Sequence, residues 1–473
     1  MFADRGICRW HQVGLAGVLA LPILAQAPQE PLPIALLYLA ETRTTFTIQG
    51  VGARSMGLGN AFTAVADDAT AVSYNPAGLA QLIEPECTFV GYHARRSYQD
   101  SDYRFMHEGQ PFTLGQPPNT FQTTQPLFLA YTLPMRFWGR NVVAQVSHHR
   151  LFDMEHRSEA TVLIRDASGQ PVQSSQESID QDGRMNVDSL AVAADLTPRL
   201  LAGFSLNRWR GHWVSGGRQA LSGGPFGPPQ TLDIHQVNTL RGTQWTIGLI
   251  WRSEVLQVGY THRAAFLMDY LFSARTAVQS GDESSLNEGR GSVGLRWPST
   301  AALGVAWRPG PRWMVAADWT RTDWSQARFE SDRSVLSGLN FFDFELDTRI
   351  RSARSLHLGV EHIALHTPGV LVPLRLGLFR EPQPHVDDAT GAQRIRRGWS
   401  LGIGVRRGRA SLDIAWTDAR SDRSVSGVTA SEAGLATPRG RERIEERRLY
   451  ASLGVRFDRD ATQRILHWLL VGR

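Results

Sequence analysis

Short segments in which apolar residues alternate with small or polar ones recur along the chain from Gln125 onward. In Thr300–Trp307 and Ser411–Thr417, for example, every second residue is mainly apolar, and the residues between are small, hydroxylated or acidic. Successive side chains of a strand point to opposite faces, so each segment has one apolar and one polar face. This pattern is typical of strands between lipid and a polar interior, and it predicts a membrane-spanning β-barrel.

The pattern identifies about 14 candidate strands, an even number, as closure of an antiparallel bacterial barrel requires. Short connections such as Gly408–Ala410 alternate with long polar ones such as Trp209–Gly242, Arg321–Ser355 and Asp418–Arg447. Short turns on one side of the membrane and long loops on the other are characteristic of outer-membrane barrels. The candidate strands are Glu86–Arg95, Gln125–Leu133, Asn141–His149, Val187–Asp195, Leu200–Arg208, Thr243–Trp251, Glu254–Thr261, Thr300–Trp307, Arg312–Thr320, Leu356–His362, Val372–Phe379, Ser400–Arg406, Ser411–Thr417 and Arg448–Phe457.

The tryptophans fall into two groups, one beside the short connections and one near the long ones. Two aromatic belts at the two membrane interfaces would produce this distribution. Core tryptophans of a soluble β-protein are the alternative. The first group is Trp138, Trp251, Trp307 and Trp313, and the second is Trp209, Trp245, Trp297, Trp319, Trp399 and Trp416.

The start of the chain has the features of an export signal. Arg5 and Arg9 precede the apolar stretch Val13–Leu24, and Ala25–Ala27 supplies a small-x-small cleavage pattern. The apolar stretch is too short for a membrane-spanning helix. We therefore expect a signal peptide over residues 1–27, an N-terminal segment with a lumen hatch over 28–84, the barrel over 85–457 and a periplasmic tail over 458–473.

Composition excludes some classes of protein. The 50 basic and 45 acidic residues are dispersed rather than clustered, which argues against a nucleic-acid partner. The mean hydropathy is slightly negative, as a barrel allows because only alternate strand residues face lipid. Cys87 would be the only cysteine of the mature chain, so an intramolecular disulfide is excluded.

Three segments are distinctive. Gly50–Leu79 combines a glycine-rich run, an acidic pair and the triplet Asn75-Pro76-Ala77. Arg296–Ser325 contains two consecutive strands followed by Asp-x-x-x-x-x-Trp, and Val372–Pro384 is the third. Together they resemble the FadL/TodX family of outer-membrane transporters for long-chain fatty acids and aromatic hydrocarbons, in which the Asn-Pro-Ala triplet is a hallmark.

The resemblance implies an all-β, 14-stranded barrel whose N-terminal segment folds inside as a hatch. It also implies passive uptake of a hydrophobic small molecule across the bacterial outer membrane. We expect a monomer in contact with outer-membrane lipid and lipopolysaccharide. PorV-type barrels, which serve protein secretion, share the first segment, so a binding platform for secreted proteins remains the alternative function.

The hatch has recognisable local signals. Asp67 or Asp68 is suited to cap a short helix that begins near Ala69, and Asn75-Pro76 fits a turn in which Pro76 takes the first helical position. Two roles for Asn75, Pro76 and Ala77 remain open, namely shaping the plug and gating it.

Charged residues on the polar faces of the strands are expected to line the lumen. Glu361 and Arg375 lie on neighbouring strands and could pair across the wall. Two functions remain open for the set: a network that holds the hatch, and an arginine that binds a ligand carboxylate. The candidates are Asp318, Glu361, Arg375, Arg406, Asp413 and Arg456.

Enzyme motifs are not apparent. The histidines lack metal-binding spacing, and neither a nucleophile elbow nor a phosphate loop occurs, so we expect no catalytic residue, metal or cofactor. The predicted barrel ends at the aromatic residue Phe457. The following residues could form a short amphipathic helix on the membrane surface or a partly ordered tail.

Overall fold

The computed structural model describes residues 50–107, 109–115, 117–225, 228–330, 350–386, 391–426 and 439–458. The expected signal peptide and nearly all of the expected C-terminal tail lie outside these ranges. Among the described residues, no helix is long and apolar enough to cross a membrane.

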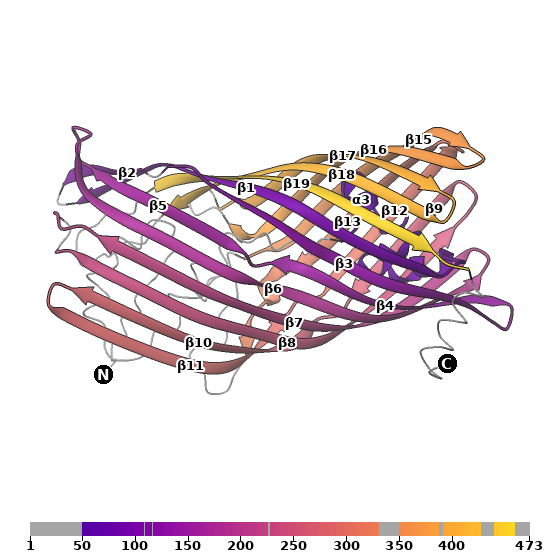
Figure 1. Cartoon of the computed structure of the whole chain (residues 1–473), viewed down its shortest axis with the longest axis horizontal. Coiled ribbons are helices and arrows are strands. Elements are labelled where there is room, and N and C mark those ends of the chain that lie inside the picture. The colour runs from indigo at the N-terminus through magenta and orange to yellow at the C-terminus, as the bar shows by residue number, and fades with distance from the viewer. Residues whose placement is uncertain are drawn as a thin grey trace.

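The strands form one closed antiparallel barrel (Figure 1). Fourteen strands make up the closed circuit, and each pairs with the next one around it until β19 pairs with β1. Each of the predicted segments overlaps with one of them, and three extend one or two residues beyond it. In order they are β1 (Glu86–His107), β3 (Asn119–Phe137), β4 (Arg140–Asp153), β6 (Pro171–Thr197), β7 (Leu200–Leu221), β8 (Gln230–Arg252), β9 (Leu256–Arg263), β12 (Thr300–Gly310), β13 (Trp313–Asp323), β15 (Ser352–Thr367), β16 (Val370–Val386), β17 (Gln393–Arg407), β18 (Ala410–Ser426) and β19 (Arg439–Arg456).

Additional strands extend the barrel at the end that carries the long connections. These are β2 (Gln110–Gly115), β5 (His156–Arg165), β10 (Phe266–Ser280), β11 (Glu283–Trp297) and the short β14 (Phe329–Glu330). Strand β10 pairs with the outer part of β8, whereas β9 pairs with its inner part. The expectation of a long loop over Trp209–Gly242 is therefore wrong, because β7 and β8 continue through most of it with an unbroken ladder. The same holds for much of Asp418–Arg447.

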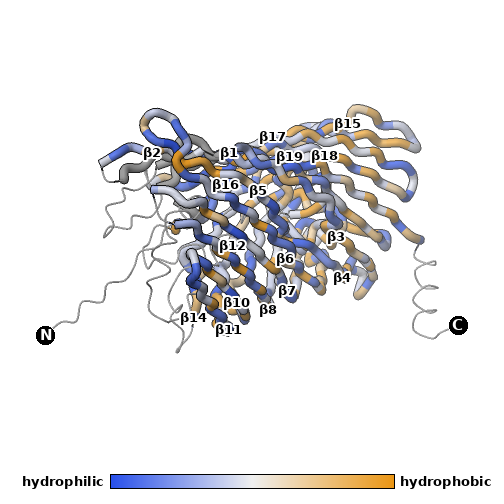
Figure 2. Tube along the Cα trace, turned by 60° about the vertical axis from the view of Figure 1, so that its left-hand side comes forward, coloured by the Kyte–Doolittle hydropathy of each residue, from blue (hydrophilic) through white to orange (hydrophobic). Residues whose placement is uncertain are grey.

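The outer surface of the barrel carries an apolar band near the short turns (Figure 2). Leu303, Val315 and Leu412 are exposed there, whereas Asp318 and Asp413 on the same strands are buried inside. Eight of the ten tryptophans assigned to the two belts are exposed, as side chains of such belts must be, but the prediction is wrong for two residues. Trp209 and Trp297 point into the barrel and are buried, because both lie beyond the apolar band, where the faces of the strands exchange character.

The segment from Gly50 to Leu82 lies inside the barrel and contains three short helices. They are α3 (Ala53–Gly57) and the 3-10 helices η1 (Ala69–Ser73) and η2 (Pro76–Gln81). Its apolar side chains pack against inward-facing residues of several strands to form one buried cluster. We call this segment the hatch, because it occupies the lumen at the level of the apolar band.

Candidate functional site

The helices of the hatch begin where the sequence places capping residues. Asp68 precedes η1, and its carboxylate accepts a hydrogen bond from the backbone N–H of Thr70 at 2.9 Å. Asn75 precedes η2, and its side-chain oxygen accepts from Ala77 N at 3.1 Å, with Pro76 in the first turn. Both caps satisfy N–H groups that a helix end leaves unpaired.

Asn75 also ties the hatch to the barrel wall. Its amide nitrogen donates to the carbonyl of Thr63 within the hatch and to the carbonyl of Leu249 on β8, both at 3.0 Å. The residue is fully buried. The Asn-Pro-Ala triplet therefore sits at a junction where one side chain joins two hatch segments and a strand.

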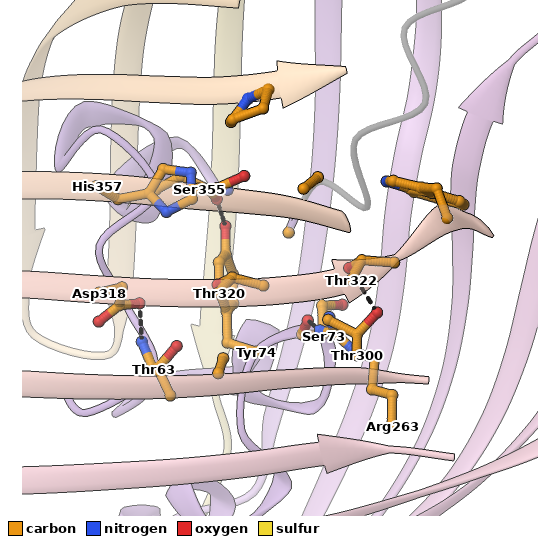
Figure 3. A pocket seen from close by; sticks show the side chains of 16 residues that line it. Thr63, Ser73, Tyr74, Arg263, Thr300, Asp318, Thr320, Thr322, Ser355 and His357 are labelled. Atoms are coloured by element: carbon orange, nitrogen blue, oxygen red, sulfur yellow. Dashed lines mark hydrogen bonds between the residues drawn. The ribbon is translucent and has the colours of Figure 1, made fainter. Parts of the chain in front are cut away.

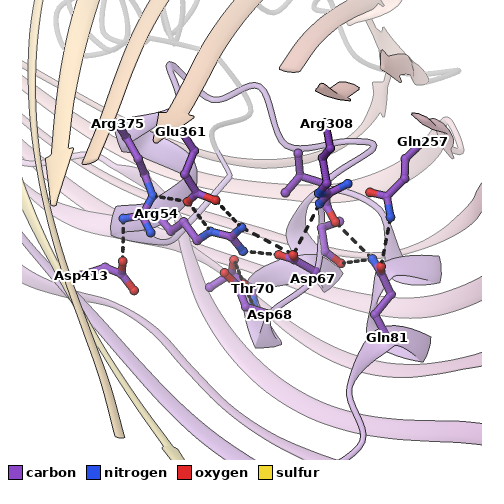
Figure 4. Close-up of polar contacts among 12 residues, drawn as sticks. Arg54, Asp67, Asp68, Thr70, Gln81, Gln257, Arg308, Glu361, Arg375 and Asp413 are labelled. Atoms are coloured by element: carbon purple, nitrogen blue, oxygen red, sulfur yellow. Dashed lines mark hydrogen bonds and ion pairs between the residues drawn. The ribbon is translucent and has the colours of Figure 1, made fainter. Parts of the chain in front are cut away.

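A chain of buried ion pairs crosses from the hatch to the wall (Figure 4). Arg54 of α3 pairs with Asp67 of the hatch and, at 3.0 Å, with Glu361 of β15. Glu361 pairs with Arg375 of β16 at 2.6 Å, and Arg375 pairs with Asp413 of β18 at the same distance. The alternating signs leave each charge beside an opposite one, which burial requires.

The other predicted lumen charges do not belong to this chain of ion pairs. Asp318 of β13 accepts hydrogen bonds from the backbone N–H groups of Phe62 and Thr63, at 2.8 and 2.7 Å, and so holds the hatch directly. Arg406 and Arg456 line a polar cavity on the short-turn side of the hatch, where Arg456 lies 3.6 Å from Glu84. The structure thus joins Glu361, Arg375 and Asp413 in one network of ion pairs. Arg406 and Arg456 line the same cavity as Asp413 but form no ion pair with the network, and Asp318 lies elsewhere.

Six inward-facing glycines let the hatch lie directly against the wall. A Cβ added at Gly377 would lie 2.0 Å from the backbone N of Gly59, and one at Gly248 would lie 2.0 Å from Oδ1 of Asn75. Such distances are far below van der Waals contact, so no larger residue fits without displacing the hatch. We call this set the glycine belt: Gly203, Gly248, Gly259, Gly304, Gly359 and Gly377.

A second polar cavity lies on the opposite side of the hatch, toward the strand extensions (Figure 3). Its lining next to the hatch includes Thr63, Tyr74 and Asp318, and its lining toward the strand extensions includes Trp324 and Ala353. Because these last two residues also belong to an apolar cluster further out, the cavity joins the hatch to that cluster.

The apolar cluster fills one side of the lumen within the strand extensions. Trp209 packs against Phe266 and Trp297 with ring centroids 5.1 and 5.8 Å apart, and Trp213 stacks on Tyr270 at 6.3 Å. We call it the aromatic cluster, and the sequence analysis missed it. The missed signal is Arg208-Trp209-Arg210-Gly211-His212-Trp213, where the charged residues face outward and the aromatic ones inward, the reverse of the pattern in the apolar band.

The opposite side of the extended lumen is charged. Glu446 of β19 accepts from Arg96 and Arg396 at 2.8 Å each, and from Arg448 at 2.7 Å. Arg396 also donates to Glu381 at 2.6 Å. The lumen outside the hatch thus has an aromatic side and a charged, basic side.

Within the described residues, no group of three or more His, Cys, Asp and Glu side chains is arranged to hold a metal ion. The arrangement instead binds a plug firmly and presents an apolar surface on one side of it.

The closed barrel, its internal hatch and the mixed lumen define a plugged β-barrel of the outer-membrane type. No protein-family model and no curated protein matches the sequence. Solved structures do match, and FadL/TodX-type barrels are among them. A FadL homologue from Pseudomonas aeruginosa is 14% identical, with a TM-score of 0.61, and the match covers 88% of this chain and 99% of that one.

Two toluene transporters match at a similar level. TodX of Pseudomonas putida is 14% identical, with a TM-score of 0.54 and coverage of 87% of this chain and 99% of that one. TbuX of Ralstonia pickettii is 14% identical, with a TM-score of 0.51 and coverage of 87% and 100%. The fold expected from the resemblance is therefore confirmed.

Proposed function

We propose that this protein mediates passive uptake of hydrophobic compounds, such as long-chain fatty acids or aromatic hydrocarbons, across the outer membrane. The observation that carries the proposal is the aromatic cluster on the lumen wall outside a closed hatch. An apolar surface shielded from water favours an apolar ligand, since burial of apolar area drives binding. The solved barrels of the same fold are a FadL homologue and toluene transporters, which supports this function.

In this mechanism the ligand binds the aromatic cluster from outside and reaches the hatch through the polar cavity. The hatch must then shift, and a ligand shifts it only by binding the open state more tightly than the closed one. The Asn75 junction and the ion pairs of Arg54 hold the closed state. No energy input is required, because the ligand moves down its own gradient.

Uptake into proteoliposomes tests the proposal with two probes, a labelled long-chain fatty acid and labelled toluene. We expect the protein to accelerate entry of at least one of them over protein-free vesicles. Trp209→Gln with Trp297→Gln places polar groups in the aromatic cluster and should slow that entry severalfold. The matched control is Trp319→Gln, which alters an exposed tryptophan on the outer surface and should leave entry unchanged.

Entry equal to that of empty vesicles for both probes would contradict the transport function. The alternative, a platform for secreted proteins, would then be tested by co-purification with exported proteins. A platform does not need an aromatic cluster on the lumen wall, and this counts against that alternative.

A further inference from the structure

A row of arginines crosses the outer surface of the barrel along the edge of the apolar band. One residue comes from each of the adjacent strands β13, β15, β16, β17 and β18. All five side chains are exposed, and all lie on the side of the band toward the strand extensions. We call this set the arginine row: Arg321, Arg354, Arg380, Arg397 and Arg420.

Members of the row stand directly opposite one another across strand pairs. Arg321 is opposite Arg354, Arg380 is opposite Arg397, and Arg397 is also opposite Arg420. Side chains in such positions have Cβ atoms roughly 4.5–5.5 Å apart, and like charges there destabilise a sheet. An anion between the arginines would stabilise these like-charge pairs.

Carboxylates of the protein do not provide that anion to the middle of the row. Within the described part of the chain, Arg354, Arg380 and Arg397 form no ion pair, whereas Arg420 lies 3.4 Å from Asp422. Arg321 has an acidic neighbour, Asp323, two residues further along its strand.

Several outward arginines elsewhere on the wall do have acidic partners. Arg210 pairs with Asp188 across β6 and β7, Arg275 lies 3.4 Å from Glu288, and Arg447 lies 3.0 Å from Asp418. The middle of the row, Arg354, Arg380 and Arg397, differs from these positions because no described carboxylate forms an ion pair with it.

The lipid-facing residues beside the row show where its anion comes from. Trp319 precedes Arg321 by two residues on the same face, Leu378 precedes Arg380, and Trp399 follows Arg397. An anion bound here is therefore level with the boundary between hydrocarbon and head groups. Arginine is suited to this task because its planar guanidinium binds phosphate through two parallel hydrogen bonds.

We propose that the arginine row is a docking surface for the phosphate groups of lipopolysaccharide in the outer leaflet. The acyl chains of the bound molecule lie along the apolar band, and its phosphates bridge opposed arginines. The inference rests on the outer-membrane location of the barrel but not on transport, so either can fail without the other.

Binding to the full-length protein in detergent, followed by native mass spectrometry, tests this surface. The probes are lipid A with both phosphates and the same lipid after enzymatic removal of the phosphates. The wild-type protein should prefer the phosphorylated lipid. Arg354→Gln, Arg380→Gln and Arg397→Gln together should reduce that preference at least about tenfold, because each arginine near an anionic head group contributes to binding.

The matched control removes the same number of exposed arginines at the short-turn end: Arg140→Gln, Arg312→Gln and Arg407→Gln. It should keep the preference. A second variant with lysine at positions 354, 380 and 397 retains the charges and should lie between wild type and the glutamine variant.

Equal binding of the two lipids by the wild type would overturn the proposal. So would an equal loss in the control variant, which would indicate a general charge effect. Uptake in vesicles made only of phospholipid should be unchanged in the glutamine variant, which separates this result from the test of transport.

Discussion

At the scale of one residue, Arg375 shows how the lumen accommodates a buried charge. Its side chain is completely buried between the carboxylates of Glu361 and Asp413. Glu361 in turn binds Arg54, so this one guanidinium supports the contact between the wall and the hatch. An unpaired charge in such a place is much less stable than a paired one.

Arg375→Met should therefore lower the free energy of unfolding by about 3–5 kcal/mol, since Asp413 loses its arginine and Glu361 keeps only Arg54. Arg375→Met with Asp413→Asn removes the stranded charge and should recover part of the loss. Urea unfolding in liposomes measures both. A double variant as unstable as the single one would show that the cost arises from packing and not from charge.

A second prediction at the same scale concerns the Asn-Pro-Ala triplet. Asn75→Ala with Pro76→Ala removes the hydrogen bonds to the carbonyls of Thr63 and Leu249, each a loss of about 1–3 kcal/mol for a buried group. The barrel should still form, because its closed strand ladder does not depend on these bonds. Heat-modified gel mobility should be normal while uptake changes clearly. An unchanged rate of uptake would show that the triplet has only a structural role.

At the scale of elements, the hatch and the wall pack closely because the glycines of the wall have no side chains. Strands of the glycine belt approach the hatch backbone so closely that the hatch cannot move sideways without first leaving the wall. A closed fit of this kind allows two discrete positions, docked and undocked, rather than gradual sliding.

Gly377→Ala should undock the hatch, since the added methyl group overlaps the backbone of Gly59 and overpacking costs about 1–3 kcal/mol. Ion conductance across a planar bilayer should rise relative to wild type. Gly91→Ala is the control, because a Cβ there meets its nearest neighbour at 3.6 Å. If both variants conduct like wild type, the belt does not hold the hatch in place.

The elements also show what sequence alone could predict. Strands that cross the apolar band were identified because their outward residues are apolar. The extensions of β7 and β8 were interpreted as loops because, beyond the lipid, the outward residues are charged and the apolar ones turn inward. The role of Arg54 was missed for another reason: its partner Glu361 is 307 positions away, and only the closed barrel brings them together.

At the scale of the whole molecule, the two faces of each strand fix how the barrel sits in the membrane. Leu303 is 46% exposed on the outside, whereas Ala302 is 5% exposed and lines the polar cavity. Leu303→Arg should destabilise the barrel by about 2–4 kcal/mol if the residue lies near the bilayer midplane. Ala302→Arg should cost less. Unfolding in liposomes compares the losses of stability of the two variants. A larger loss for Ala302→Arg would mean that the lipid-facing and lumen-facing sides are inverted.

The length of β6 has a consequence for the cell surface. Its 27 residues, at roughly 3.3 Å each and tilted by about 40°, rise to about 70 Å, against an apolar band of about 25 Å. Under the proposed outer-membrane location, with the strand extensions outward, much of the barrel stands above the lipid. The tip of the β10–β11 hairpin at Gly281 is among the parts that an antibody or a phage tail fibre would meet early, and an epitope inserted there should be detected on intact cells.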